Sequence, residues 1–306
     1  MILHRCVPAL LVAPLLALAG SVPEKIEIDI AGKPFTTFYS GVDAWKPFLA
    51  PLRAASGTVV SRHFPMEQVE GESHDHLHHR GLWFSYDDVN GIKFWENDPS
   101  YKTPNRGKII VEKASLKRHG DRQVFEGVFN WVGPDGKILL VENRGMTFWG
   151  TPALRVIDFD ITLKAPGKVV FGDTKEGAFA IRLADALTEK RKGGKMVNAD
   201  GQEGMKNVWG KRSNWVDYSG AINGEKLGVA MFDHPSNPRH PVYWHARDYG
   251  LFALNPFGQH AFDPSGEESH WTVDAGGSLH FRWRVVIHEG DTTEAHIADL
   301  YQEYAR

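Results

Sequence analysis

Four histidines lie within six residues of this chain, at His74, His76, His78 and His79, and they form its densest group of reactive side chains. In an extended backbone His74, His76 and His78 would share one face, each roughly 6.5 to 7 Å from the next. Adjacent pairs could chelate one divalent ion, and neutral imidazole suits Zn, Cu, Ni or Fe. A bend, or ligands from elsewhere, would be needed to bring all three to one metal. With such a bend, the segment predicts a divalent-metal site with His74, His76 and His78 as ligands.

Acid/base catalysis is a second chemistry that the same segment can supply. Imidazole titrates near neutral pH, so His78 or His79 can act as general acid or base. Arg80 and Trp83 follow and fit substrate binding, because a guanidinium steadies negative charge and an indole face stacks on a sugar ring. The alternative interpretation is a polar loop whose histidines only pack against their neighbours.

Prolines stiffen a second polar segment, residues 232–247. Pro235, Pro238 and Pro241 fix its backbone at a low entropic cost, which would hold the polar side chains between them around a site. A proline-stiffened structural corner would show the same pattern. The predicted site residues of this segment are Asp233, Arg239 and Trp244 for substrate binding and His240 and His245 for metal binding or proton transfer.

A carboxylate and a guanidinium mark the third candidate segment, residues 172–182. Glu176 stands at the start of a predicted strand that contains Arg182. A carboxylate there can serve as a catalytic base, a metal ligand or an acceptor for sugar hydroxyls, and Arg182 can bind substrate. Equally, Glu176 could only form an ion pair with Arg182 or Lys175.

Aromatic side chains surround the three segments. Their faces stack on the apolar faces of sugar rings while neighbouring Asn, Asp, Arg and His side chains bind hydroxyls, so the mixture favours a carbohydrate ligand. Core packing is the more frequent role of any single tryptophan, and the prediction rests on the group. Its members are Trp83, Trp95, Trp209, Trp215, Tyr218, Trp244 and Phe257, of which Trp83, Trp215 and Trp244 are the predicted substrate contacts.

Several other function classes lack their sequence signals. The chain has no phosphate-cradling glycine loop, no dinucleotide fingerprint and no Gly-x-Ser-x-Gly elbow, so we expect no nucleotide cofactor. Its formal net charge is −3 and it has no long basic stripe, so nucleic acid is not an expected partner. The expected partner is a small-molecule or oligosaccharide substrate.

The first 20 residues have the pattern of a signal peptide. His4 and Arg5 precede an apolar run from residue 7 to 18, and small residues follow it. The run is shorter than the roughly 20 residues of a membrane-spanning helix, and no other stretch approaches that length. We therefore expect an exported protein, periplasmic or secreted, without a membrane span. The only cysteine, Cys6, would leave with the signal peptide, so the mature chain would have no disulfide.

Short runs of period two, broken by glycine, proline and asparagine, predict strands and turns along the rest of the chain. The clearest run is 278–288, followed by 154–164, where a slip of phase at Val156 and Ile157 predicts a bulge. Pro134 and Gly136 predict a hairpin turn at 132–137. Further strands are predicted at 25–30, 35–39, 81–86, 124–132, 138–149, 178–183, 227–232 and 251–255.

These elements predict an all-β protein in which residues 21–306 form a single large antiparallel β-sandwich. The one persuasive helix is 292–304, a short C-terminal cap. Residues 189–211 are polar and rich in glycine, and they predict a long loop or a strand that runs over the surface.

The three segments also carry a family resemblance. With HDHLHHRGLWF from His74, DTKEGAFAIR from Asp173 and FDHPSNPRHP from Phe232, the chain resembles a family of exported bacterial proteins labelled "methane oxygenase PmoA". The methane monooxygenase subunit of that name is an integral membrane protein, whereas this chain has no membrane-spanning stretch. The resemblance implies sugar metabolism, because family members are found beside sugar oxidoreductases, and the sequence is also similar to galactose-mutarotase-like sandwiches.

Three functions remain open from the sequence. The first is an exported enzyme that acts on a sugar or glycoside by His/Glu acid/base chemistry, with or without a divalent metal, as a lyase, hydrolase or epimerase. The second is a carbohydrate-binding protein without catalysis. The third is a metal-dependent oxidase or oxygenase, as the family label indicates.

Overall fold

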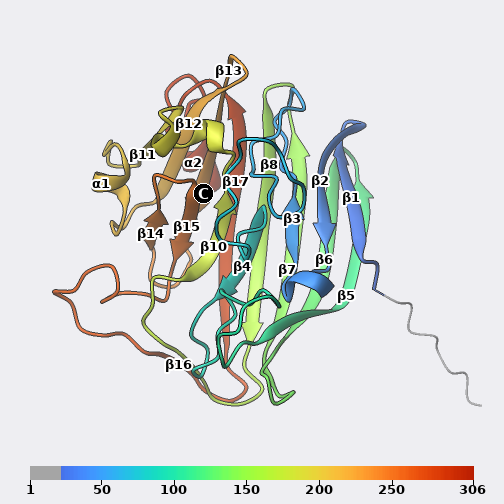
Figure 1. The fold of residues 1–306 in the computed structure, drawn as a ribbon, viewed down its shortest axis with the longest axis vertical. Helices are drawn as coiled ribbons and strands as arrows, with labels where there is room; N and C mark the ends of the chain where they lie inside the picture. Colours follow the sequence, from blue (N-terminus) through green and yellow to red (C-terminus); the bar gives the residue numbers. More distant parts are fainter. Residues whose placement is uncertain (1–21) are drawn as a thin grey trace, which may run out of the picture.

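Two antiparallel β-sheets stacked face to face make up this protein, as a computed structural model shows (Figure 1). The structure describes residues 22–306, and the predicted signal peptide at 1–20 lies outside the described residues. The predicted all-β sandwich with a short C-terminal helix is confirmed.

The first sheet has seven strands, and it carries the candidate site. Its hydrogen-bonded order is β1 (Lys25–Ile30), β2 (Lys33–Tyr39), β3 (Phe48–Ala50), β4 (Leu82–Tyr86), β10 (Gly177–Arg182), β15 (Leu251–Asn255) and β14 (Tyr243–Ala246). Every residue of β3, β4, β10 and β15 is buried, so these strands are covered on both faces.

The second sheet has eight strands, most of them longer. Its order is β11 (Gly194–Asn198), β12 (Trp215–Ile222), β13 (Glu225–Asp233), β17 (Ser278–Glu289), β8 (Leu154–Lys164), β7 (Ile138–Gly150), β6 (Arg122–Val132) and β5 (Lys108–His119). Smaller elements are the strand pair β9 (Val169–Phe171) and β16 (Trp271–Val273), the helices α1 (Met205–Val208) and α2 (Ile297–Tyr304), and the 3-10 turns η1 (Val42–Ala44), η2 (Asp185–Leu187) and η3 (Glu189–Arg191).

Aromatic side chains from the inner faces of both sheets form the centre of the core. Trp283 of β17 stacks on Phe179 of β10 at 5.1 Å and lies 5.5 Å from Phe84 of β4. Phe159 of β8 meets Phe179 edge to face at 4.6 Å. Each such side chain contributes about 1.5–3 kcal/mol by leaving water, which holds the two sheets together.

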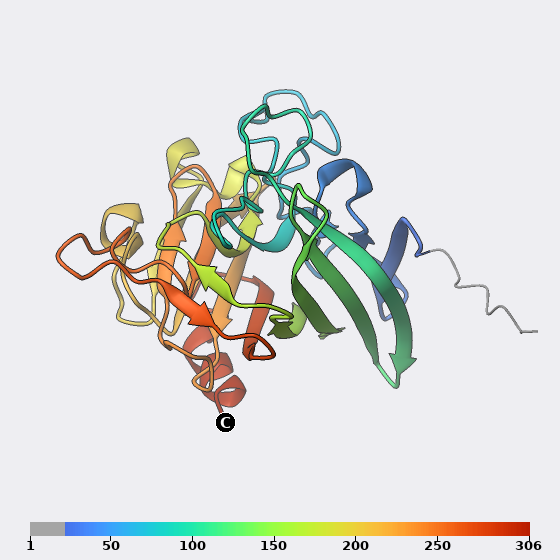
Figure 2. The ribbon, with the colours of Figure 1, turned by 90° about the horizontal axis from the view of Figure 1, so that it is seen from below.

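The bulge predicted at Val156 and Ile157 is wrong. Strand β8 pairs with β7 and β17 in continuous register over its whole length. Val156 faces the outer side of the eight-stranded sheet, where it is buried with Ile297 and Tyr301 of α2. Val156 is therefore apolar because α2 packs against it, and not because the strand changes phase. Figure 2 shows α2 in red below the sheets, on the side opposite the cyan and teal loops.

The structure also refines the predictions for two segments, one near the C-terminus and one in the middle of the chain. The predicted helix 292–304 begins as a regular α-helix only at Ile297, after a turn. The polar stretch 189–211 contains the edge strand β11, so it takes the second of its two predicted forms. Strand β5 was not predicted, because an edge strand carries charges that hide its alternation.

A buried histidine–aspartate pair anchors the C-terminal segment to the eight-stranded sheet. His288 Nε2 lies 2.9 Å from Asp217 Oδ1, and both side chains are 0% exposed. Thr292 donates a hydrogen bond of 2.6 Å to the other oxygen of Asp217. A Cβ on Gly228 would lie 2.3 Å from the His288 ring, so glycine makes room for it. Burial alone would lower the pKa of His288, but Asp217 outweighs burial and raises the pKa.

We expect the stability that this pair contributes to depend on pH. Because the pKa of His288 is raised on folding, the contribution is fully present below about pH 6.5, the ordinary histidine pKa, and is lost as the pH rises through the folded-state pKa. His288→Gln should lower the free energy of unfolding by about 3–5 kcal/mol at pH 6 and by less at pH 9. Urea denaturation at both pH values measures this, with the exposed His119→Gln as control. Equal losses at the two pH values would contradict the prediction.

Candidate functional site

The candidate site lies on the outer face of the seven-stranded sheet, the face turned away from the eight-stranded sheet. One row of paired residues crosses five strands there: Phe48 of β3, Trp83 of β4, Ala180 of β10, Ala253 of β15 and His245 of β14. Because side chains alternate between faces, this row brings parts of all three predicted segments to one surface.

The histidine loop, residues 74–81, folds back over this face. His76 adopts a positive φ of 47°, and its carbonyl accepts a hydrogen bond of 2.9 Å from the N–H of His79. Gly81 is required behind the turn, because it has a φ of 51° and a Cβ there would lie 2.0 Å from the Leu49 carbonyl oxygen. The turn stacks His76 on His79 at 4.6 Å. The chain therefore contains the bend that the metal prediction required.

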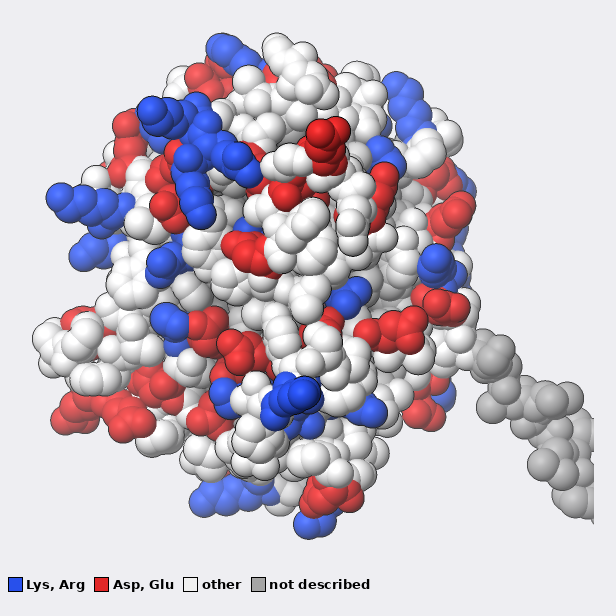
Figure 3. Space-filling view, in the orientation of Figure 1, with Lys and Arg blue, Asp and Glu red and all other residues white. Residues whose placement is uncertain are grey.

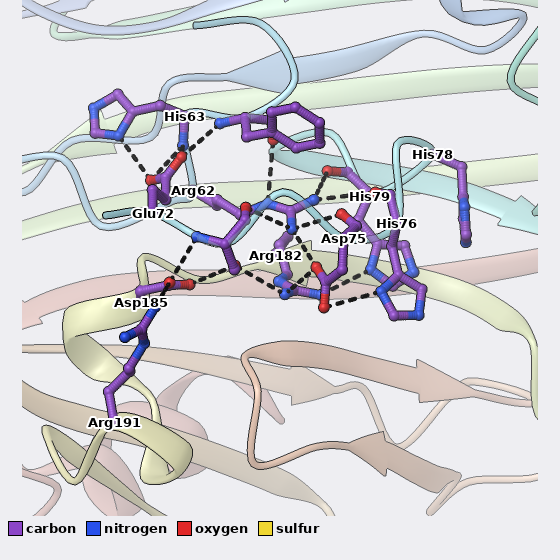
Figure 4. A network of polar contacts seen from close by, with 12 residues as sticks. Arg62, His63, Glu72, Asp75, His76, His78, His79, Arg182, Asp185 and Arg191 are labelled. Carbon is purple, nitrogen blue, oxygen red and sulfur yellow. Dashed lines mark hydrogen bonds and ion pairs between the residues drawn. The ribbon is translucent and has the colours of Figure 1, made fainter. Parts of the chain in front are cut away.

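Two buried guanidinium groups fix the histidine loop to the sheet (Figure 4). Arg62 and Arg182 each donate to the same oxygen of Asp75, at 2.6 Å, and both guanidinium side chains are 0% exposed. Arg62 also donates to the carbonyl oxygens of His76 at 3.0 Å and His79 at 3.2 Å. Burial would raise the pKa of Asp75, but Arg182, His76 and Arg62 outweigh it and hold the pKa below its usual value.

His78 and His79 are buried and neutral. Burial, followed by the charge of Lys46, lowers the pKa of His78 to about 2, and burial lowers the pKa of His79 well below its ordinary value. His78 Nδ1 lies 2.9 Å from the Tyr101 hydroxyl, and His79 Nδ1 lies 3.2 Å from Arg182 Nη1. A guanidinium only donates, so His79 accepts at Nδ1 and carries its proton on Nε2. This geometry favours neutral hydrogen-bonding roles over proton transfer for both residues.

His245 and Glu176 lie further along the same face. The Nδ1 of His245 lies 2.9 Å from the carbonyl oxygen of Lys175, which only accepts, so this nitrogen carries the proton and Nε2 keeps its lone pair. Burial lowers the pKa of His245 to about 4, although Glu176 opposes the shift. The half-buried Glu176 carboxylate forms an ion pair with Lys175. Glu176 therefore forms the ion pair with Lys175 that was the alternative to a catalytic role, and it also lies on the face where catalysis was predicted.

Asp87 is a carboxylate of this face that sequence reasoning missed. It continues the outer-face series of Trp83 and Ser85 beyond β4, and its N–H donates to the Glu176 carbonyl oxygen at 3.0 Å. Burial raises the pKa of Asp87 to about 6, despite Lys93 at 3.6 Å. The period-two alternation of Trp83, Ser85 and Asp87 could have identified it.

Further residues of the face were also missed because only tertiary contacts bring them there. Tyr249, half-buried, stacks on His76 at 5.4 Å. Lys46 is buried and donates to the Trp95 carbonyl at 2.7 Å, and burial lowers its pKa well below the ordinary value. The predicted Arg80 lies beside the face as well, held by Asp98 at 2.7 Å.

Buried polar atoms without a hydrogen-bond partner concentrate on this face. Within residues 22–306, seven of the thirteen such side-chain atoms belong to it. Each costs about 1–3 kcal/mol, and a concentration of such groups is typical of a functional site. The seven atoms are Arg80 Nε, Trp83 Nε1, Ser85 Oγ, Asp87 Oδ1, Trp95 Nε1, Arg182 Nε and Arg247 Nε.

The proline-rich segment is mostly a structural corner. Asp233, fully buried, accepts from Asn237 and His240 at 2.7 Å each and from Trp283 Nε1 at 3.1 Å. Arg239 donates to the Phe257 carbonyl at 3.1 Å and to the hydroxyl of Ser269 at 2.8 Å. The structure therefore places Asp233, Arg239 and His240 away from the histidine loop, whereas the predicted His245 reaches the outer face.

The three predicted tryptophan contacts are buried. Trp83 is 1% exposed beneath His79, Trp244 is 0% exposed, and Trp215 is 7% exposed. Trp244 stacks on Phe252 in the core, and Trp215 packs near α2. None of the three offers a free ring face to a sugar, because packing takes both faces. The half-buried Tyr249 and Tyr101 are the aromatic rings that border the face.

The predicted metal ligands do not converge. The ring of His74 stacks on Phe64 at 4.6 Å, away from the other two. The rings of His76 and His78 lie 5.7 Å apart with their planes at 68°, and His78 Nδ1 contacts the Tyr101 hydroxyl at 2.9 Å. No group of three or more His, Cys, Asp or Glu side chains is placed to hold a metal ion in the part of the chain that the structure describes. His74, His76 and His78 therefore do not form a three-ligand set in the described residues, and a bound metal stays a prediction.

We expect the purified protein to bind well below one equivalent of metal, because the three histidines do not form a ligand set. Plasma mass spectrometry on the mature protein and on the His76→Ala, His78→Ala double variant measures the content. One equivalent of copper, iron or zinc that disappears in the double variant would contradict this expectation and restore the predicted metal site.

A groove of about 500 Å³ lies on the other sheet, lined by residues that include Glu126, Asn143 and Asp160. None of the predicted site residues lines it, so cavity size does not locate the reactive groups. No helix described between residues 22 and 306 is long and apolar enough to span a membrane.

Comparison with solved structures finds larger proteins at low sequence identity. An alpha-galactosidase from Lactobacillus brevis matches with a TM-score of 0.43 and 8% identity over 88% of this chain and 40% of that one. A GH36 alpha-galactosidase from Geobacillus stearothermophilus matches with a TM-score of 0.44 and 10% identity, again over 88% and 40%. A glycoside hydrolase family 97 enzyme from Pseudoalteromonas sp. strain K8 matches with a TM-score of 0.38 and 11% identity, over 87% of this chain and 34% of that one. This chain thus spans about 40% or less of their length.

Sequence comparison gives a family without an assigned activity. No curated protein matches the chain. A model described as a family of unknown function, DUF6807, matches residues 25–302. The methane oxygenase label of the resemblance therefore stays a prediction. Since the match spans nearly the whole described chain, this protein belongs to the family of unknown function DUF6807.

Proposed function

We propose that this protein is a carbohydrate-active enzyme that transfers protons on the outer face of the seven-stranded sheet. The observation that carries the proposal is the meeting, on that one face, of neutral imidazoles with two carboxylates in different environments. Neutral hydrogen-bonding groups beside half-buried aromatic rings suit a ligand rich in hydroxyls.

Asp87 and Glu176 would divide the acid and base roles. With a pKa of about 6, Asp87 keeps a proton near neutral pH in part of the molecules and can donate it. Glu176, a neighbour through the backbone hydrogen bond of Asp87, would act as base. The free lone pair of His245 would accept a hydrogen bond from a sugar hydroxyl and orient it. Lyase, epimerase and hydrolase reactions all use such a pair.

We expect Glu176→Gln and Asp87→Asn each to lower turnover by about 10²- to 10⁴-fold, the usual contribution of one acid or base. Substrates are first sought by mass spectrometry and NMR among hexoses, hexuronates and their methyl glycosides. If Asp87 is the acid, activity falls as the pH rises through about 6, and the Asp87→Asn variant loses this dependence. The exposed Asp160→Asn, on the other sheet, is the control. Full activity in both site variants would contradict the proposed roles.

A carbohydrate-binding protein without catalysis is the second candidate, favoured by the very low pKa of His78. The same variants separate the two functions. Sugar binding without turnover in the unmodified protein, unchanged in Glu176→Gln, would identify a binding protein. The metal-dependent oxidase would be identified by one equivalent of redox metal.

We further propose that the protein is exported, on the strength of its first 20 residues. Expressed with its full sequence in a bacterial host, it should appear in the periplasm or medium with an N-terminus near residue 21. Mass spectrometry of the intact protein measures this. A cytoplasmic protein that retains residues 1–20 would contradict export.

A further inference from the structure

One end of the outer face has more guanidinium groups than carboxylates to pair with them. Arg62 and Arg182, both fully buried, share a single oxygen of Asp75. Within the described residues, the side chain of Arg247 makes no ion pair, and its Nε is buried without a hydrogen-bond partner. The Nε of Arg182 is likewise without a partner. This end therefore holds donors for an anion that its own carboxylates do not use.

Arg182 and Arg247 meet at one aromatic ring. The guanidinium carbon of Arg182 lies 4.7 Å from the Tyr249 ring centroid, and that of Arg247 lies 5.6 Å from it. Arg247 follows His245 by two residues, so both side chains project from the outer face of the β14 end. The free guanidinium thus lies beside the proposed proton-transfer groups and within reach of the same ligand.

The other carboxylates nearby are already committed. Glu72 accepts from the N–H groups of His63 and Phe64 at 3.0 and 2.8 Å, and Asp185 accepts from Ser73 and pairs with Arg191. Glu189 accepts from the N–H groups of two residues at the β11 and α1 ends. Glu176 pairs with Lys175, and no ion pair joins Arg247 to a carboxylate of the described residues.

Exposed basic residues surround the same end. Lys190 and Lys192 flank Arg191 in and after η3, and the Lys190 N–H donates to the carbonyl oxygen of Asp248, between Arg247 and Tyr249. Figure 3 shows Lys and Arg side chains gathered over the η3 and β11 part of the molecule, at the upper left. On a chain with a net charge of −3, this local basic surface would draw an anionic ligand toward the site.

We propose that the substrate is an acidic sugar whose carboxylate is bound by Arg247, with the charge of the buried Arg182 at the same Tyr249 ring adding to the attraction. The inference rests on the proposed carbohydrate function and names its substrate class. A planar guanidinium matches a carboxylate in two parallel hydrogen bonds, and a half-buried one binds it more strongly than an exposed lysine does. The carboxylate would fix the sugar so that its ring extends over Tyr249 toward His245 and Glu176.

Paired ligands test the proposal by isothermal titration calorimetry. D-Glucuronate is compared with neutral D-glucose, D-galacturonate with D-galactose, and D-gluconate with D-glucitol. We expect at least one acid to bind at least tenfold more tightly than its neutral partner, with an affinity that falls as NaCl rises. D-Glucose 6-phosphate serves as a second anion, and tighter binding of the phosphate than of every carboxylate would overturn the assignment.

Variants of Arg247 locate the contact. Arg247→Gln should weaken binding of the acid by about 10- to 100-fold, the range for losing a charge-assisted hydrogen bond, and leave any neutral sugar unchanged. Arg247→Lys keeps the positive charge but loses the two parallel hydrogen bonds of the guanidinium. Its affinity for the acid should lie between those of the unmodified protein and Arg247→Gln. Arg122→Gln, on the outer face of the other sheet beside Trp149, is the matched control. Unchanged affinity for the acid in folded Arg247→Gln would overturn the proposal.

The outcomes also separate this inference from the function on which it rests. If neutral sugars bind as tightly as their acids, the acidic substrate is refuted while the carbohydrate function stands. If no sugar binds, acid or neutral, both are refuted.

Discussion

Two buried guanidinium groups that share one carboxylate oxygen hold the outer face of this protein together. Charges are costly to bury, and the arrangement persists because Arg62 also satisfies three carbonyl oxygens of the histidine loop and the second oxygen of Asp75 remains near His76. The loop has no regular strand or helix of its own to hold it. Its position over Trp83, and hence the placement of His78 and His79, follows from this network.

Burial of the loop, which this network maintains, keeps the two imidazoles neutral. Burial lowers the pKa of both His78 and His79, and the guanidinium charges of Arg182 and Arg62 add to the effect. A histidine held neutral presents one donor and one acceptor at every physiological pH. That property fits the recognition of hydroxyl groups.

Much of the sandwich could be predicted from the sequence, because alternation reports burial directly. Residues 154–164 and 251–255 are strands with the predicted bounds. The alternation of apolar and polar residues does not predict burial correctly where a second layer covers the strand, as α2 covers Val156. It also does not reveal a charged edge strand such as β5. Local sequence carries no signal for either situation, since both depend on what packs from elsewhere.

Some predicted site residues lie together and others do not, for related physical reasons. The reactive residue types were recognisable, and His78, His79, Arg182, Glu176 and His245 do lie on one face. The proline-rich corner has an equally reactive composition, yet Asp233 uses its hydrogen bonds to fix Trp283 and His240. Composition cannot tell a polar group that binds its own chain from one that remains available. Asp87 and Arg247 were missed because their significance lies in partners that they lack.

The outer face is electrically uneven, and this unevenness links the proposed substrate to the proposed chemistry. At the end with Arg62, Arg182 and Arg247, positive charge exceeds what Asp75 can balance. At the other end, burial raises the pKa of Asp87 to about 6, and the charges of Glu96 and Glu176 act in the same direction. An anionic sugar would be held at the first end and so could not enter with its carboxylate toward Asp87, where like charges repel. The charge distribution would thereby set one orientation of the ring, with its neutral carbons presented to the acid and base.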